Sequence, residues 1–113
     1  MNTVTIGISS LENVRKRTAA AFRGKKQGTH ISFANEELLW KTLTPKRWAL
    51  LKTMSGRSSM PIREIARRVG RDVRAVHSDV HVLLKVGMLK RNDDGRVVFP
   101  YDAIHVNFLI SAA

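Results

Sequence analysis

Hydrophobic and polar residues follow two different periods along this chain, and each change of period marks a predicted element. Strict alternation over residues 3–9 predicts a short strand with one apolar face. Apolar residues then recur at helical spacing over residues 11–22, after serines that can cap a helix. Residues 23–29 contain two glycines and three basic residues without periodicity, which predicts a loop or basic arm. The first third of the chain is therefore expected to run strand, helix, loop.

The next segment predicts a short strand over residues 30–33 and two helices. Asn35 can cap a brief helix that carries two glutamates in its first turn, where the helix dipole favours acids. Thr44 followed by Pro45 is a typical start for a second helix, which we expect to end near residue 54. The side chains expected to point into the core are Trp40, Trp48, Leu51 and Met54.

Residues 60–99 carry the pattern around which the rest of the chain is organised. Residues 62–69 predict a helix with one apolar side, ended by Gly70, which suits the left-handed conformation of a sharp turn. Asp72 can cap a longer helix that ends at Gly87. Two short strands, 88–91 and 96–99, flank the polar turn 92–95, as in a hairpin. This order of elements is typical of a winged helix-turn-helix, in which the second helix enters a DNA major groove.

The longer helix has an unusual distribution of charge. If Val76, Val80 and Leu83 face inward, steps of ~100° per residue place a cationic, hydrogen-bonding row on the opposite side. No acid lies in that row, since Asp79 falls on the flank, whereas an ordinary solvated helix gains from pairs of opposite charge. Such a row suits phosphates and base edges. Its members are Arg74, Ser78, His81 and Lys85, with His77 at the margin.

A further strand is predicted over residues 103–110, beyond a winged module that is already complete at residue 99. This strand and the N-terminal strand both need a partner, so we expect them to pair with each other or with a second copy in a dimer. We therefore predict a mainly helical α+β fold with a dimerisation arm (1–34), a winged helix-turn-helix (35–99) and a C-terminal dimerisation strand (100–113). The expected interface residues are Val4, Ile6, Ile8, Ile104, Val106, Phe108 and Ile110.

Composition narrows the class of partner. The chain has 113 residues, with 20 Lys plus Arg against 9 Asp plus Glu, a formal net charge of +11 that favours polyanions, nucleic acid first. It contains no cysteine, which excludes disulfides and thiolate chemistry and is typical of a reducing compartment. Without a secretory signal or an apolar run of ~20 residues, we expect a cytoplasmic protein with no membrane contact.

Metal binding, catalysis and RNA binding are less well supported by the sequence than DNA binding. His77 and His81 lie four apart on one helical face, a spacing that can bind zinc, but neither a neighbouring HExxH frame nor a third ligand is evident. No nucleophile elbow or phosphate-binding glycine loop is present, so we expect no enzyme, no metal and no cofactor. An RNA-binding protein is a further, less favoured alternative, because RNA-binding sheets usually expose aromatic residues and these are only 6% of this chain. A pure protein-interaction module remains an alternative.

The segment VGRDVRAVHSDVHVLLKVGML, residues 69–89, resembles the helix-turn-helix of MarR-like winged-helix regulators. The flanks TIGISSLENVRKRTAAAFRG and PYDAIHVNF are similar to a compact prokaryotic group of predicted MarR-like regulators, whose genes often stand as the antitoxin of toxin–antitoxin pairs. Many relatives carry a basic residue where this chain has Ser78. The resemblance implies an autorepressor or a toxin-neutralising antitoxin. By position, it implies that Arg71, Val73, Arg74, His77, Ser78 and His81 face the groove.

We therefore predict a homodimeric regulator whose two longer helices engage successive major grooves of a near-palindromic double-stranded operator. In this prediction Arg74, Ser78 and His81 contact bases or nearby phosphates, with His77 at the edge of the contact. A cognate toxin is a further expected partner if the antitoxin resemblance holds. Contacts to the DNA backbone are expected from Arg63, Arg67, Arg71, Lys85, Lys90, Arg91 and Arg96.

Overall fold

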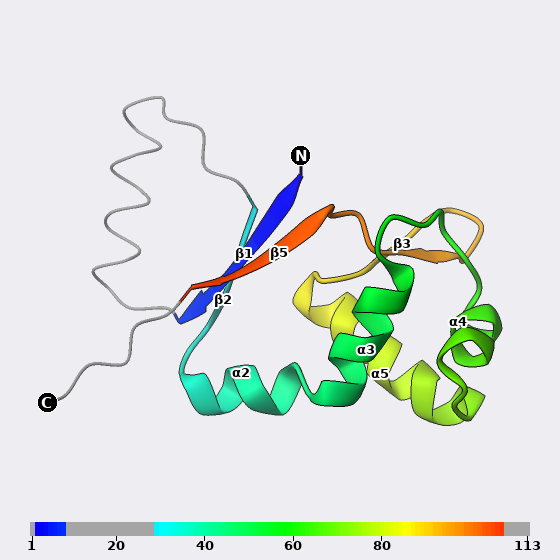
Figure 1. Cartoon of the computed structure of the whole chain (residues 1–113), viewed down its shortest axis with the longest axis horizontal. Coiled ribbons are helices and arrows are strands. Elements are labelled where there is room, and N and C mark those ends of the chain that lie inside the picture. Colours follow the sequence, from blue (N-terminus) through cyan, green and yellow to red (C-terminus); the bar gives the residue numbers. More distant parts are fainter. Residues whose placement is uncertain (1, 9–28, 108–113) are drawn as a thin grey trace, which may run out of the picture.

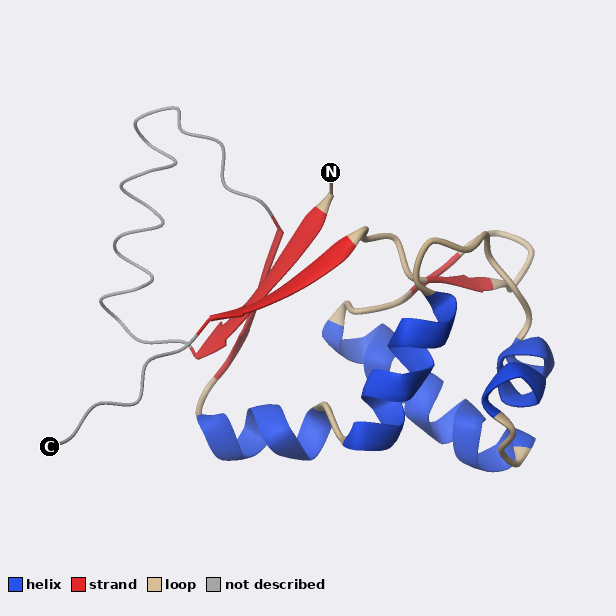
Figure 2. Cartoon of the chain, in the orientation of Figure 1, coloured by secondary structure: helices blue, strands red, loops and turns tan. Residues whose placement is uncertain are grey.

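The computed structural model describes residues 2–8 and 29–107, and in this part of the chain the fold is a small α+β arrangement (Figures 1 and 2). Four helices are described together with a three-stranded parallel sheet and a two-stranded antiparallel hairpin. The helix expected over residues 11–22 lies outside the described residues. The elements in order are β1 (Thr3–Ile8), β2 (Thr29–Phe33), α2 (Glu36–Thr42), α3 (Pro45–Met54), α4 (Ile62–Val69), α5 (Val73–Val86), β3 (Lys90–Arg91), β4 (Val97–Val98) and β5 (Ala103–Asn107).

The N-terminal and C-terminal strands pair with each other in the same chain, which is one of the two arrangements expected from the sequence. The strand order is β2-β1-β5, and both pairings of β1 are parallel. Two hydrogen bonds join the start of β1 to the start of β5. The Asn2 N–H donates to Asp102 Oδ2 at 2.7 Å, and the Asp102 N–H donates to the Asn2 carbonyl at 2.7 Å. The predicted C-terminal strand begins at Ala103 as expected, and its residues 108–110 lie outside the described part.

The apolar face of β1 packs inside the protein, as the alternation predicts. Val4 and Ile6 are both 0% exposed within the single chain. This burial corrects their assignment to a dimer interface, because the chain's own core covers them and leaves nothing for a second copy to contact. Of the other expected interface residues, Ile8 and Ile104 are half-buried and Val106 is 37% exposed. Phe108 and Ile110 lie outside the described residues.

Helix ends follow the capping residues recognised in the sequence. Asn35 Oδ1 accepts from the Leu38 N–H at 2.8 Å, and Thr44 Oγ1 accepts from the Arg47 N–H at 3.3 Å. Gly70 adopts the left-handed conformation with φ 70°, and its N–H closes the last turn of α4. Because Asp72 starts α5 only two residues later, α4 and α5 are joined by a turn of three residues.

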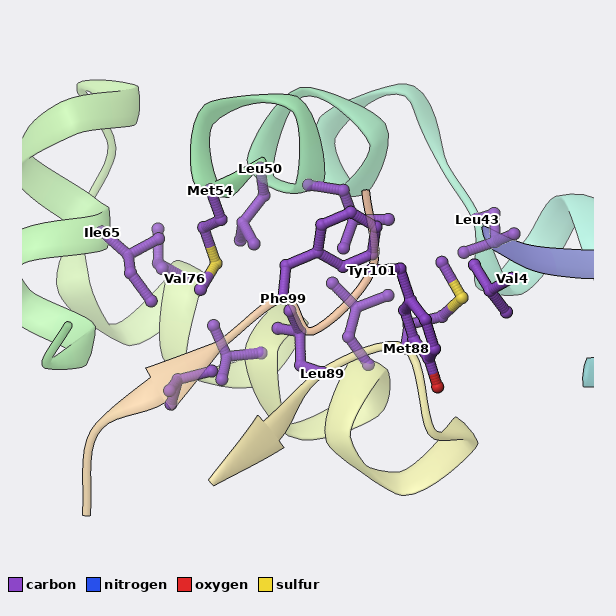
Figure 3. Packing of buried hydrophobic residues seen from close by; sticks show 14 of the residues in the cluster. Val4, Leu43, Leu50, Met54, Ile65, Val76, Met88, Leu89, Phe99 and Tyr101 are labelled. Atoms are coloured by element: carbon purple, nitrogen blue, oxygen red, sulfur yellow. The ribbon is translucent and has the colours of Figure 1, made fainter. Parts of the chain in front are cut away.

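The hydrophobic core lies between α3, α4 and α5 and continues to β1 (Figure 3). Leu50, Leu51 and Met54 project into it from α3 and are at most 1% exposed. One expectation was wrong, since Trp40 is 51% exposed. Trp48 is half-buried and packs against the core, as expected of an inward side chain. On the seven-residue helix α2, the inward positions are Leu39 and Thr42, three residues apart, so the side chain next to Leu39 points away from the core.

The hairpin is shorter than predicted, since β3 begins at Lys90 rather than at Met88. Met88 and Leu89 are buried, and their N–H groups donate to the Leu83 carbonyl at 2.9 and 3.2 Å, so they complete the end of α5 instead. In the polar turn, Gly95 has φ 83° and its N–H donates to the Asn92 carbonyl. The hairpin therefore lies directly beside the C-terminal end of α5.

Candidate nucleic-acid interface

The exposed side of α5 is the face that the sequence singled out. Val76, Val80 and Leu83 are each 0% exposed and fix the rotation of the helix about its own axis. Because successive residues are ~100° apart, the opposite side is set at the same time. The polar residues that this rotation leaves exposed are Arg74, His77, Ser78, His81 and Lys85. Two apolar residues of the first turn are also exposed, Ala75 and Val73, the latter at 48%.

Asp79 is the only acid in α5, and its carboxylate is turned away from this exposed row. Asp79 Oδ1 accepts from Arg47 Nε at 3.0 Å, and Asp79 Oδ2 accepts from Arg71 Nη1 at 2.8 Å. The Asp79 side chain is 13% exposed, against 18% for Arg47 and 22% for Arg71. Two guanidinium groups thus neutralise the one carboxylate of the helix, and the exposed side of α5 carries no negative charge.

The structure places Arg71 in this ion-paired cluster. The family resemblance had instead implied that Arg71 faces the DNA groove. Its guanidinium binds Asp79 and is mostly covered, so Arg71 is not one of the exposed residues that line the outer side of α5. Arg47 was not singled out from the sequence. It lies 32 positions before Asp79, on α3, and an ion pair over that separation follows no local periodicity.

One open concavity runs between α5 and the hairpin. It has a volume of about 600 Å³ and is lined by His77, His81, Leu84, Lys85 and Arg91. The two imidazole rings are parallel within 6°, with 6.5 Å between their centroids. The fold therefore brings four of the predicted contact residues, three from α5 and one from β3, to a single cationic hollow.

The arginines of α4 differ in whether their guanidinium groups are free to contact a ligand. Arg63 and Arg67 are exposed, but Arg67 Nε donates to Glu64 Oε2 at 3.0 Å and Arg68 Nε donates to Glu64 Oε1 at 2.9 Å. The hydrogen bond from Arg67, helped by the positive charges of both arginines, lowers the pKa of Glu64 from 4.5 to about 2 despite partial burial. Glu64 therefore stays charged and offsets part of the positive charge of α4.

A second hollow lies between the loop before α4 and the hairpin. It measures about 470 Å³, and its charged lining residues are Arg57, Arg68, Arg96 and Glu64. Arg57 and Arg68 were not among the predicted contacts, because a basic residue on a loop or on the polar side of a helix is ordinarily only solvated. Lys90 is exposed on β3, and Arg96 Nε lies 3.8 Å from Asp94 Oδ2.

Among residues 2–8 and 29–107, no three His, Cys, Asp or Glu side chains come together in a way that could hold a metal ion. None of the helices described is long and apolar enough to cross a membrane. His77 and His81 are thus a pair without a third ligand in the described part of the chain.

Comparison with known proteins identifies a family for the chain. No curated protein and no solved structure matches the sequence. The model of one protein family, HVO_A0114, matches residues 42–106, from the last residue of α2 into β5. The matched segment is more than half of the 113 residues and includes all of α3, α4, α5 and the hairpin. The chain therefore belongs to the HVO_A0114 family.

Proposed function

We propose that this protein is a winged helix-turn-helix transcriptional regulator that binds double-stranded DNA with α5 in the major groove. The support from architecture is the order α4, three-residue turn, α5 and antiparallel hairpin. A left-handed glycine in that turn and a polar cap on α5 are the local features that such a motif needs. In this proposal α5 is the recognition helix and β3–β4 is the wing.

The observation that carries the proposal is the acid-free exposed side of α5. Arg74, Ser78 and His81 lie along it, while the one carboxylate of the helix is held by two arginines at its flank. A carboxylate on that side would repel phosphates in the groove, and its removal from the surface favours a polyanion. A helix fits the width of the major groove, where such side chains can reach base edges.

The proposed contacts divide by position. Arg74, Ser78 and His81 contact bases or nearby phosphates, and His77 lies at the edge of the contact. The Ser78 hydroxyl donates to the Arg74 carbonyl at 3.3 Å, which leaves its oxygen lone pairs as acceptors toward a base. Arg71 is withdrawn from the proposed contacts because it is bound to Asp79. The residues proposed to hold the DNA backbone are Arg63, Arg67, Lys85, Lys90, Arg91 and Arg96.

The proposed regulator acts as a homodimer in the cytoplasm and represses its own promoter. Support for the dimer comes from β5, which is an edge strand of the sheet and leaves one row of backbone groups without a described strand partner. Val106 on this strand is 37% exposed, and Ile104 is half-buried. Two copies joined there would present two recognition helices to a near-palindromic operator.

Selection from a random double-stranded DNA library, with the purified protein as bait, tests the proposed function. We expect an enriched sequence with two related halves and an affinity that falls steeply with salt. Equal affinity for selected DNA, scrambled DNA and single-stranded RNA would contradict sequence-specific recognition. Stable capture of a protein partner such as a toxin, without any enriched DNA, would favour the antitoxin alternative over the regulator.

A further inference from the structure

We infer that Arg47 is a positioning residue, which sets the orientation of α5 by joining it to the C-terminal end of α2. This inference rests on the proposed function, because it concerns how the recognition helix is presented to DNA. Arg47 itself contacts no base in the proposal. It acts through Asp79, on the side of α5 next to the exposed row.

The guanidinium of Arg47 bonds two elements at once. Its Nε donates to Asp79 Oδ1 of α5 at 3.0 Å. Its Nη1 donates to the carbonyl of Thr42 at 2.8 Å and to the carbonyl of Lys41 at 3.3 Å, both in the last turn of α2. With 18% of its side chain exposed, Arg47 forms a largely covered bridge between the two helices and not a fully exposed ion pair.

Both ends of this bridge have a physical need for a cation. The last carbonyls of a helix lack intrahelical donors and carry partial negative charge, so a cation with N–H groups stabilises them. The Asp79 side chain is 13% exposed, and a carboxylate that is largely covered is costly to leave without a charged, hydrogen-bonding partner. Lysine could satisfy one of these ends, but only the planar fork of arginine has separate N–H groups aimed at both.

The bridge limits how α5 can move. Asp79 immediately follows Ser78 and lies five residues after Arg74, so a rotation of α5 about its axis displaces all three together. Arg71 Nη1 holds the second oxygen of Asp79 at 2.8 Å from the turn before α5. The carboxylate is thus fixed from α3 and from that turn, and the exposed row is fixed with it.

The bridge also connects the sheet to α5. In sequence α2 directly follows β2, which pairs with β1, and β1 pairs with the edge strand β5 (Figure 1). Thr42, whose carbonyl Arg47 binds, is the last residue of α2 and is buried. A path of packed and hydrogen-bonded elements therefore runs from the proposed dimer edge through α2 and Arg47 to the proposed recognition helix.

Distances between spin labels test this inference directly, because the chain has no cysteine of its own. Labels at Glu36→Cys on α2 and Ala75→Cys on α5 occupy exposed sites that the bridge does not use. The distance distribution is measured by double electron–electron resonance in the full chain, in the Arg47→Lys, Asp79→Asn and Lys52→Gln backgrounds. Lys52 is exposed on α3 and serves as the matched control. Affinity for the selected DNA is measured in the same variants without labels.

We expect Arg47→Lys and Asp79→Asn to broaden the α2–α5 distance distribution and to weaken specific DNA binding by about tenfold or more, because the contact geometry is lost. Arg47→Lys should leave the salt slope unchanged, since it removes no phosphate contact. Lys52→Gln should leave the distance distribution unchanged. A lower melting temperature with unchanged distances and affinity would overturn the inference and make Arg47 a stabilising residue only. If the unaltered protein binds no DNA, the proposed function fails, and the distance measurement still decides the bridge.

Discussion

Asp79 Oδ2 accepts a hydrogen bond from Arg71 Nη1 at 2.8 Å, and this bond joins α5 to the turn that precedes it. The contact gives two residues a different role from the one expected. Arg71 was predicted to face DNA, and Asp79 was placed only on the flank of the helix. Their pairing shows how the sole acid of α5 is kept from its exposed side. The structure thereby supplies a physical reason for the charge pattern seen in the sequence.

Replacing Asp79 with asparagine should destabilise the fold. The change leaves Arg47 and Arg71 with only a neutral acceptor, and both side chains are largely covered. We expect the free energy of unfolding to fall by about 2 kcal/mol, a value reduced for partial exposure to water. Urea denaturation measures this change. Asp93→Asn, at the exposed hairpin turn, is the control and should alter the free energy by less than about 0.5 kcal/mol. Equal losses in the two variants would contradict the ion-paired cluster.

Lowering the pH should weaken the contribution that Glu64 makes to folding stability. Hydrogen bonding by Arg67 lowers the pKa of this carboxyl from 4.5 to about 2 in the folded chain. A carboxyl whose pKa is lowered by folding stabilises the native state above its unfolded pKa, and this stability is lost as the pH falls toward the folded pKa. The difference in melting temperature between the natural protein and Glu64→Gln should therefore be largest near neutral pH and shrink between about pH 4.5 and 2. If the difference in melting temperature stays constant over this pH range, the protonation of Glu64 is not coupled to folding.

The local elements could be predicted because local chemistry determines them. Asn35, Thr44 and Asp72 cap the helices that they were expected to start, and Gly70 has the left-handed conformation that ends α4. The inward face of α5 was also confirmed, since three apolar residues at helical spacing admit one burial direction. These features depend on neighbours within one or two turns.

The contacts that were missed join distant parts of the chain. In the sheet, the pairing of β1 with β5 was one of the two arrangements expected, whereas the pairing of β1 with β2 was missed. Alternation alone indicates that a strand has an apolar face without naming its partner. The bond from Arg47 to Asp79 spans 32 residues. Trp40 was misplaced because a seven-residue helix offers too few positions to define a face from its pattern. The burial of Val4 and Ile6 likewise depends on elements far away in the sequence.

Gly7 should be required for the pairing of β1 with β5. A Cβ atom at this position would lie 2.9 Å from the carbonyl oxygen of Asn107, closer than real contacts allow. Gly7→Ala is expected to lower the free energy of unfolding by about 1–3 kcal/mol, because the strands must shift apart. Thermal denaturation against Thr3→Ala, in the same strand, measures the specific part of this loss. Comparable stability of the two variants would mean that β5 does not approach Gly7 this closely.

The proposed dimer makes a prediction about β5. If its free edge joins a second copy, Val106→Lys should shift the protein toward monomer, because a charged side chain on an edge strand opposes strand addition. Size-exclusion chromatography with light scattering at micromolar concentration measures the mass. Lys52→Ala, exposed on α3, is the control and should leave the dimer intact. A monomeric natural protein at that concentration would rule out the proposed dimer.

The central claim, that the acid-free side of α5 reads DNA, is tested most directly by the double variant Arg74→Ala with His81→Ala. The measurement is the ratio of dissociation constants for the selected DNA and a scrambled duplex, by fluorescence anisotropy at fixed salt. The matched control, Lys52→Ala with His30→Ala, removes one lysine and one histidine that are exposed outside α5 and outside β5. We predict that the ratio falls at least about tenfold in the first variant, since base contacts are worth about 1–3 kcal/mol each, and is unchanged in the control. An unchanged ratio in the Arg74 and His81 variant would contradict the claim.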